Sequence, residues 1–160
     1  MRIVIYPGTF DPIHCGHLDI AERAAALFDK LIFAVAVNAE KNPLFSPKER
    51  IEMIIESTKH IPNIEAYSAD GLVADFAKKH NAVALIRGLR HVSDFEFEFQ
   101  MATMNQHLNS DVSTLLMVTS EKFIHLNSSM VKDVARLKGD ISKFVPKNVM
   151  NHLREKYKLT

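Results

Sequence analysis

Two histidines flank a glycine near the amino terminus, and their side chains could bind phosphate. They belong to the segment YPGTFDPIHCGH (residues 6–17), which follows a short apolar run and leads into a helical pattern. The start of a helix offers free backbone N–H groups and the positive end of the helix dipole. His14 and His17 lie three residues apart on the first turn and can add imidazole N–H donors, while Gly16 lets the backbone approach a ligand. The segment therefore predicts a phosphate-binding site.

Two other interpretations of these histidines are less favoured. A lone histidine at this position would be explained as a surface residue or a helix cap with no ligand. Two histidines and a glycine at a strand-to-helix junction together favour a ligand site. A metal site built from His14, Cys15 and His17 has no fourth ligand at a suitable spacing, and adjacent side chains point apart. We therefore expect no metal ion held by protein ligands alone.

A second basic cluster closes a later apolar run, in the sequence IRGLR (residues 86–90). Guanidinium groups bind phosphate oxygens through paired donors, and each such hydrogen bond contributes about 1.5–3 kcal/mol. Taken alone, Arg87 and Arg90 would be interpreted as solvated surface residues. If the two apolar runs are neighbouring parallel strands, however, their carboxyl ends line one crevice. We therefore predict that His17, Arg87 and Arg90 converge on one anion-binding cleft.

Five short runs rich in Val, Ile and Leu have the composition of strands that are buried on both faces. We expect these strands at residues 2–6, 31–38, 64–67, 83–87 and 112–118. Helical patterns separate the runs, so the strands should pair in parallel through right-handed connections. The sequence predicts an α/β fold with a Rossmann-like, doubly wound, five-stranded parallel sheet and helices on both faces, in a single domain spanning residues 1–160.

Apolar stripes at helical spacing predict the helices that cover this sheet. The stripes are Ile20, Ala24, Leu27 and Phe28, then Ile51, Ile54, Ile55 and Thr58, and then Leu72, Val73, Phe76 and Ala77. The best-defined start is at Ser46, where SPKE forms a capping box with proline at the first helical position. Two later helices are expected, one capped by Ser128 or Ser129 and reaching about Leu137, the other opened by Pro146 and reaching Tyr157.

Residues 95–99 alternate between Phe and Glu, as an amphipathic strand would, but the longer pattern favours a helix. Ser93 and Glu96 match a capping box. One side of this helix would carry Phe97, Met101, Met104 and Leu108, and the other Phe95, Phe99 and Ala102. A helix that is apolar on two sides usually buries both, here one against its own sheet and one against another subunit. The pattern therefore indicates a homo-oligomer.

Bulk properties limit the partners. The chain of 160 residues is 47% hydrophobic and 24% charged, which suits a globular core. Its net charge of +1 provides no broad basic field for nucleic acid. Cys15 is the only cysteine, which excludes an internal disulfide and favours a reduced, cytoplasmic compartment. No apolar run is long enough for a membrane span, and Pro7 and Gly8 interrupt the first run too early for a signal peptide.

Four motifs together resemble the bacterial phosphopantetheine adenylyltransferase family over essentially the whole chain. They are YPGTFDPIHCGH (residues 6–17), KNPLF (41–45), IRGLR followed by DFEFE (86–98), and NSSMVK (127–132). The HxGH signature alone indicates only the nucleotidylyltransferase superfamily, whereas RGLR with DFEFE narrows the resemblance. It implies a nucleotidylyltransferase domain that transfers the adenylyl group of ATP to 4′-phosphopantetheine, giving dephospho-coenzyme A and pyrophosphate.

The resemblance also implies residue roles. ATP would contact Thr9, Phe10, His14, His17, Gly88, Leu89, Arg90, Glu98, Phe123, Ile124, His125, Leu126, Asn127, Ser128 and Ser129. Phosphopantetheine would contact Thr9, Lys41, Val73 and Arg87, with Lys41 and Arg87 at its phosphate. The catalytic residues would be His17, Lys41 and Arg90, with His17 stabilising the transition state. Family members often have threonine where His14 stands and serine where Asn127 stands, and both pairs can form hydrogen bonds.

The resemblance further implies Mg²⁺ as cofactor, a homohexamer, and coenzyme A as a candidate inhibitor. The chemistry agrees with a site made of donors and cations. A phosphate monoester is largely dianionic at neutral pH, so it needs no general base to attack the α-phosphorus of ATP. The protein has to position the reactants and stabilise the charge on the equatorial oxygens, while Mg²⁺ offsets charge on the departing pyrophosphate.

Three other functions would share part of this pattern. A nucleotidylyltransferase acting on nicotinamide mononucleotide or glycerol phosphate would share the first motif but should lack RGLR with DFEFE. A nucleotide-binding regulatory module without catalysis could use the same crevice. A dinucleotide dehydrogenase is disfavoured because no GxGxxG follows the first strand.

Overall fold

The sheet has five parallel strands in the order β3-β2-β1-β4-β5. A computed structural model of the chain describes residues 1–37 and 42–159. The strands are β1 (Ile3–Gly8), β2 (Lys30–Ala36), β3 (Ile64–Ala69), β4 (Ala82–Leu89) and β5 (Ser113–Val118). Each expected strand is present, with ends that differ from the prediction by at most two residues. The predicted end of the second strand, Asn38, lies outside the described residues.

The strand order reverses at β1, and this reversal creates the place for a ligand. From β1 the chain moves outward through β2 to β3, then crosses back to place β4 on the other side of β1. β1 and β4 pair directly, with Val4 opposite Ala84 and Ile5 opposite Leu85. The carboxyl ends of two neighbouring strands therefore border one crevice at a topological switch point, as the sequence predicted.

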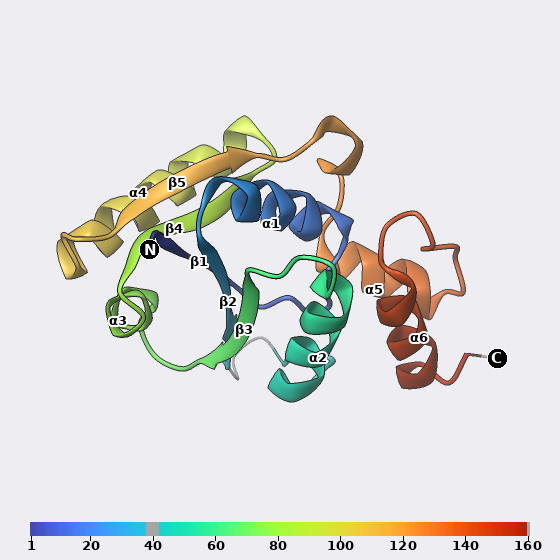
Figure 1. The fold of residues 1–160 in the computed structure, drawn as a ribbon. Helices are drawn as coiled ribbons and strands as arrows, with labels where there is room; N and C mark the ends of the chain where they lie inside the picture. The colour runs from blue at the N-terminus through green and yellow to red at the C-terminus, as the bar shows by residue number, and fades with distance from the viewer. Residues whose placement is uncertain (38–41, 160) are drawn as a thin grey trace.

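Helices cover both faces of the sheet (Figure 1). On one face lie α1 (Cys15–Leu27) and α2 (Pro47–Thr58), which pack on Val4, Tyr6 and Phe33 in the larger hydrophobic cluster. On the other face α3 (Val73–Lys79) packs on Ile5, Ile32 and Leu85 in a second cluster, with α4 (Val92–Leu108) beside it. Successive strand residues thus belong to opposite layers, which confirms the doubly wound α/β fold.

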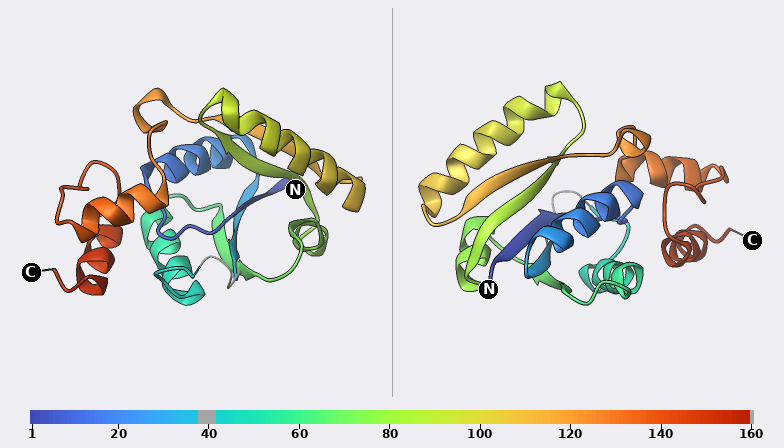
Figure 2. Two further views of the ribbon diagram at one scale, coloured as in Figure 1. Left: turned by 180° about the vertical axis from the view of Figure 1, so that it is seen from behind. Right: turned by 45° about the horizontal axis from the view of Figure 1, so that its top comes forward.

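The carboxyl-terminal part of the chain packs beside α2. After β5 come a short 3₁₀ turn (Glu121–Phe123), α5 (Ser128–Arg136) and α6 (Lys147–Lys156). Figure 2 shows α5 and α6 at one end of the molecule in both views, away from α3 and α4. Val131, Ala135, Val149 and Leu153 bury their side chains in the larger cluster. The start of α5 is thereby held next to the turn that follows β1.

The best-defined helix start was predicted correctly, and three others require correction. The Ser46–Glu49 capping box is present, with hydrogen bonds of 3.2 and 2.7 Å. α4 begins at Val92, two residues earlier than a Ser93–Glu96 box allows, because the Asp94 carboxylate accepts the backbone N–H of His91.

The other two corrections concern α5 and α6. Asn127, and neither Ser128 nor Ser129, caps α5, since its Oδ1 accepts the N–H of Met130 at 2.8 Å. Pro146 is the residue before α6 and does not form its first turn.

The apolar stripes of the helices are only partly buried. In α1 and α2, Leu27 and Ile55 are exposed, while Ala21 and Met53, outside the predicted stripes, are buried. In α4 the expectation that one stripe is buried against the sheet is wrong, because large side chains of both stripes are exposed. Glu98 is the buried residue of this helix. The apolar faces of α4 are therefore uncovered in the single chain.

The helices of the described residues are too short or too polar to cross a membrane.

Candidate active site

A cleft of about 800 Å³ opens at the carboxyl ends of β1 and β4. His17 from the first turn of α1, Arg87 from β4 and Arg90 just after β4 all line it. His17 lies 70 positions before Arg87 and 73 before Arg90 in the chain. The predicted convergence of the imidazole and the two guanidinium groups is therefore present in the fold.

The structure brings most of the predicted site residues to this cleft. Besides His17, Arg87 and Arg90, the lining includes Thr9, Phe10, His14, Val73, Gly88, Glu98, Phe123, Leu126, Asn127 and Ser128. Four predicted ATP contacts are not among the lining residues: Leu89, Ile124, His125 and Ser129. Lys41 lies outside the described residues. The placement agrees with a shared site, while the individual roles stay predictions.

His14 and His17 cap α1 with their rings stacked on each other. His14 Nδ1 accepts the N–H of Gly16 at 3.1 Å, and His17 Nδ1 accepts the N–H of His14 at 3.2 Å. The ring centroids are 3.7 Å apart, with an angle of 22° between the planes. Since both Nδ1 atoms accept, the ring proton of each neutral histidine belongs on Nε2. Only that edge of each imidazole remains to donate to a ligand.

Both histidines are held in the neutral form. Burial, with a smaller contribution from the nearby Arg90, lowers the pKa of His14 to about 4. Burial also depresses the pKa of His17 well below its usual value, with further contributions from His14, Arg90 and Arg87. The site therefore presents neutral N–H donors beside permanently charged guanidinium groups at physiological pH.

Glycines allow the close packing around these rings. A Cβ on Gly16 would lie 3.0 Å from Cε1 of His14, so the ring packs against the glycine backbone. The sequence assigned Gly16 to ligand approach, and Gly16 does line the cleft, while the ring of His14 fills the space that a Cβ would need. A Cβ on Gly8 would lie 2.9 Å from the ring of Phe10. The absence of a side chain at Gly16 and Gly8 therefore leaves room for the rings of His14 and Phe10.

Phe10 holds the turn after β1 in an unusual backbone conformation. Its φ is 51°, in the left-handed region, which costs a non-glycine residue about 1–2 kcal/mol. Its buried ring packs edge-on against Tyr6, Phe33 and His17, with centroids 5.0–5.2 Å away. Burial of a phenylalanine contributes about 1.5–3 kcal/mol, which offsets the backbone cost. The turn that presents Thr9 is thus fixed by packing beneath His17.

Arg87 is oriented by a buried carboxylate. Its Nε and Nη2 donate to Glu98 at 2.8 and 2.7 Å, and its Nη1 donates to the carbonyl of Pro7 at 3.0 Å. The Glu98 bonds raise the pKa of Arg87 further. A guanidinium has five N–H groups, so among the described residues two remain for an anion in the cleft. The resemblance assigns Glu98 to ATP, but here it holds Arg87.

Arg90 is held more loosely at the cleft edge. Its Nη1 donates to the carbonyl of Leu126 at 3.2 Å, and its Nε lies 3.4 Å from the Asp94 carboxylate. Asp94 also accepts the backbone N–H groups of Arg90 and His91, which helps to keep the pKa of this carboxyl low although burial alone would raise it. Arg90 therefore connects the end of β4 to the segment that precedes α5.

The side chains of the cleft are compatible with a metal ion that is bound mainly by the phosphates of the substrate. The described residues contain no cluster of three or more His, Cys, Asp or Glu side chains that could hold an ion. The two carboxylates of the cleft lining, Asp94 and Glu98, already accept hydrogen bonds. Mg²⁺ commonly keeps several waters and binds substrate phosphates with one or two protein ligands at most. A Mg²⁺ ion that arrives with phosphate is compatible with these described residues.

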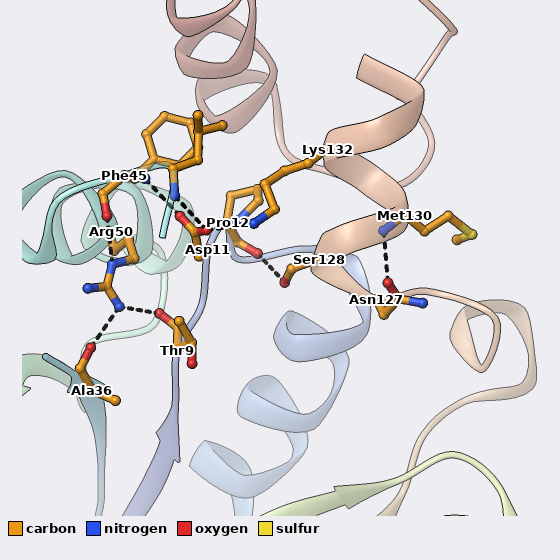
Figure 3. Close-up of polar contacts among 11 residues, drawn as sticks. Thr9, Asp11, Pro12, Ala36, Phe45, Arg50, Asn127, Ser128, Met130 and Lys132 are labelled. Carbon is orange, nitrogen blue, oxygen red and sulfur yellow. Dashed lines mark hydrogen bonds and ion pairs between the residues drawn. The ribbon is translucent and has the colours of Figure 1, made fainter. Parts of the chain in front are cut away.

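Three charged residues near the site were missed by the sequence analysis. Asp11, Arg50 and Lys132 form polar contacts under the turn after β1 (Figure 3). Asp11 lies inside the first motif, so its position was a usable signal. Arg50 follows a capping box on an amphipathic helix and has the sequence context of a surface residue. Nothing local identifies its partners.

The fold and the cleft define a nucleotidylyltransferase-like protein. The chain matches the cytidylyltransferase-like family over residues 5–134. A crystal structure of a Vibrio parahaemolyticus protein assigned as a nicotinate-nucleotide adenylyltransferase superposes with a TM-score of 0.71. The alignment covers 100% of this chain and 98% of the other at 16% identity, which shows a common fold.

A relative from Caldanaerobacter subterraneus subsp. tengcongensis gives a narrower assignment. It is named phosphopantetheine adenylyltransferase and is 55% identical to this chain over 158 residues, or 99% of both sequences. The chain belongs to the phosphopantetheine adenylyltransferase family.

Proposed function

We propose that this protein transfers the adenylyl group of ATP to 4′-phosphopantetheine, which gives dephospho-coenzyme A and pyrophosphate in coenzyme A biosynthesis. The observation that carries the proposal is the convergence of His17, Arg87 and Arg90 on one cleft. The family membership, at 55% identity over 99% of the chain, specifies the substrates.

The reaction is one in-line displacement. A phosphate oxygen of phosphopantetheine attacks the α-phosphorus of ATP, the bond from that phosphorus to the bridging oxygen breaks, and its electron pair leaves with pyrophosphate. The nucleophile is already anionic, so no residue has to remove a proton. The neutral Nε2–H of His17 donates to an equatorial oxygen, where charge builds up in the transition state. Positive charge from Arg90 stabilises the same phosphate.

The acceptor phosphate is assigned to the other half of the cleft. The N–H groups of Arg87 that Glu98 and Pro7 leave available bind it as a charge-assisted pair. Lys41, carried over from the family motif KNPLF, adds a second cation. The resemblance assigns Thr9 to both ATP and the acceptor phosphate and Val73 to the pantetheine arm, and both residues line the cleft. Fixing both reactants in this way lowers the entropic cost of the reaction.

ATP is assigned to the half of the cleft formed by α1 and the start of α5. The resemblance implies ATP contacts at His14, Gly88 and Arg90 and along residues 123–129, of which Phe123, Leu126, Asn127 and Ser128 line the cleft. Mg²⁺ supplies charge neutralisation on the pyrophosphate that leaves. Coenzyme A contains the same pantetheine arm, which makes it a competitive inhibitor of this cleft.

A homohexamer in the cytoplasm completes the proposal. The support for self-association is the run of exposed apolar side chains on α4, which includes Phe95, Phe97 and Phe99 at 48–59% exposure. The number six comes from the family resemblance, and the compartment from the absence of a cysteine pair in the sequence. Light scattering on the purified protein measures the subunit number, and a monomer would contradict this part of the proposal.

The experiment that tests the activity is a pyrophosphate-release assay with ATP, Mg²⁺ and a set of acceptors. Phosphopantetheine should support turnover, and dephospho-coenzyme A should appear in equal amount by mass spectrometry. Nicotinamide mononucleotide and glycerol phosphate should give background rates. Preference for either of these would contradict the proposed acceptor. ATP binding without turnover on any acceptor would favour the regulatory module.

A further inference from the structure

Asp11 connects two segments that are distant in the sequence. Its carboxylate is buried and accepts the backbone N–H groups of Leu44 and Phe45, both at 2.9 Å. These two residues lie between the segment that carries Lys41 and the start of α2. Asp11 itself lies two residues after Thr9, in the turn that enters the cleft. The carboxylate thus joins the turn after β1 to the chain that follows Lys41.

Arg50 also connects the turn after β1 with the chain that follows Lys41. Its side chain is only 1% exposed, and Nη1 donates to the carbonyls of Thr9 at 2.7 Å and Ala36 at 2.9 Å. Its Nε donates to the carbonyl of Phe45 at 3.1 Å. Ala36 ends β2 and Phe45 precedes α2, so Arg50 holds the chain before and after the segment with Lys41 (Figure 3).

Lys132 connects this assembly to the ATP half of the cleft. Its ammonium group lies 2.7 Å from Oδ2 of Asp11, with Lys132 on the second turn of α5. At the first residue of the same helix, the hydroxyl of Ser128 donates to the carbonyl of Pro12 at 2.9 Å. Figure 3 shows both contacts reaching from α5 to the turn after β1. The start of α5, which lines the cleft, is therefore tied to the turn that carries Thr9.

We propose that Asp11, Arg50 and Lys132 act as one positioning unit that sets the acceptor half of the cleft against the ATP half. Arg50 and Asp11 fix Thr9 and the flanks of the Lys41 segment, and Lys132 fixes both to α5. None of the three side chains lines the cleft. The inference rests on the proposed function, because it takes the two halves to bind the two substrates.

The reason for such a unit lies in the reaction. In-line transfer needs the acceptor oxygen and the α-phosphorus within a narrow range of distance and direction, and a misplacement of about 1 Å can cost about 10²-fold in rate. The residues assigned to the two substrates include Thr9 in the turn after β1, Lys41, and Ser128 at the start of α5, which belong to separate segments of the chain. Buried charge-assisted hydrogen bonds are short and directional, so they transmit position better than apolar contacts do.

The kinetic test uses Lys132→Met, which removes one bond of Asp11 and leaves its two backbone donors in place. At a temperature well below the melting point, kcat should fall roughly 10- to 100-fold, with the KM for ATP changed less than threefold. Lys132→Arg, which keeps the charged donor, should recover most of the rate. A lower melting temperature with an unchanged kcat would reduce the unit to a structural role and overturn the inference.

Lys30→Met is the matched control. Lys30 Nζ lies 2.6 Å from Glu65, its side chain is 29% exposed against 24% for Lys132, and it stands at the opposite end of the sheet from the cleft. This variant loses a lysine–carboxylate pair of similar length with a similarly exposed lysine, although Glu65 is 37% exposed against 4% for Asp11. Its kcat should match that of the wild type. An equal fall in kcat for both variants would contradict a role specific to Lys132.

A second measurement needs no turnover, and its first arm uses only the wild-type protein. Addition of ATP to the wild-type protein should slow hydrogen exchange at the amides of Leu44 and Phe45 several-fold, because α5 then holds Asp11 more firmly. Lys132→Met should abolish this effect. Absence of the ATP effect in the wild type would overturn the inference. Failure of phosphopantetheine as substrate, by contrast, would overturn the proposed function and leave this effect in place.

Discussion

Glu98 holds Arg87 through two parallel hydrogen bonds of 2.7 and 2.8 Å. Glu98 is the buried residue of α4, at 6% exposure, and its carboxylate fixes the plane of the guanidinium. A fork of this kind determines the direction in which the remaining N–H groups point. Glu98 is therefore a positioning residue for Arg87 in this structure, although the family resemblance pairs it with ATP.

Glu98→Gln should separate these two roles. The glutamine side chain has one oxygen that can accept a hydrogen bond, and its NH2 group would face an N–H group of Arg87. At least one of the two charge-assisted hydrogen bonds to Arg87 is therefore lost. We expect the KM for phosphopantetheine to rise about 10- to 100-fold, as the loss of roughly 1.5–3 kcal/mol implies, with the KM for ATP nearly unchanged. Steady-state kinetics with each substrate varied in turn measure both values.

The exposed neighbour Glu96 provides the control for Glu98→Gln. Glu96→Gln removes the same charge from the same helix, and its kinetics should match those of the wild type. A rise in the KM for ATP that equals the rise for phosphopantetheine would support a direct contact between Glu98 and ATP instead.

His17→Ala should lower kcat about 10²- to 10³-fold with a smaller effect on ATP binding. The imidazole donates to charge that develops only in the transition state, and loss of one such donor has a cost of this size. Stopped-flow ATP binding and steady-state turnover together distinguish the two effects. Because His17 also accepts the N–H of His14, circular dichroism should establish that α1 remains folded. Unchanged turnover would remove His17 from the mechanism.

Removal of divalent ions should abolish turnover while the protein stays folded. The described residues hold no cluster of metal ligands, so the ion is expected to come with ATP. EDTA should reduce pyrophosphate release to background, and excess Mg²⁺ should restore it. The melting temperature without ATP should be the same with and without EDTA. A large fall in that temperature would indicate a protein-held metal and contradict the proposal.

The fold was predictable because its signals are local and agree with one another. Each strand is a short Val- and Ile-rich run, and Ser46 with Glu49 marks a helix start by two reciprocal bonds. Where two possible capping boxes overlap, the sequence does not show which of them begins the helix. Ser93–Glu96 and His91–Asp94 both have the spacing of a capping box, and the backbone used the second.

The site was predictable in its convergence and unpredictable in its internal bonds. Parallel strands bring His17 and Arg87 together by topology alone. By contrast, the buried Arg50 donates hydrogen bonds to the backbone carbonyls of residues 9, 36 and 45. These three residues have no regular spacing along the chain, so the sequence does not predict that their carbonyls come together. The tautomer of His17 likewise depends on one backbone N–H that only the folded cap provides.

The capping histidines make stability depend on pH. An exposed histidine in the unfolded chain has a pKa near 6.5. In the folded protein burial lowers the pKa of His14 to about 4 and that of His17 well below its usual value. Between these limits the unfolded chain binds more protons than the folded one. The stabilisation is therefore complete above about pH 6.5 and is lost as the pH falls toward the folded pKa values.

His14→Thr should make the protein less sensitive to acid. In the wild type the free energy of unfolding should fall by up to about 1.4 kcal/mol per pH unit for each of the two histidines between pH 6.5 and 4.5. Threonine removes one titrating ring and can still cap the helix, so the slope should decrease by about one proton. Carboxyls with lowered pKa values, such as Asp19 and Asp94, contribute chiefly at more acid pH and do not obscure this window. Urea unfolding at several pH values measures the slope, and equal slopes for variant and wild type would show that His14 is not protonated on unfolding.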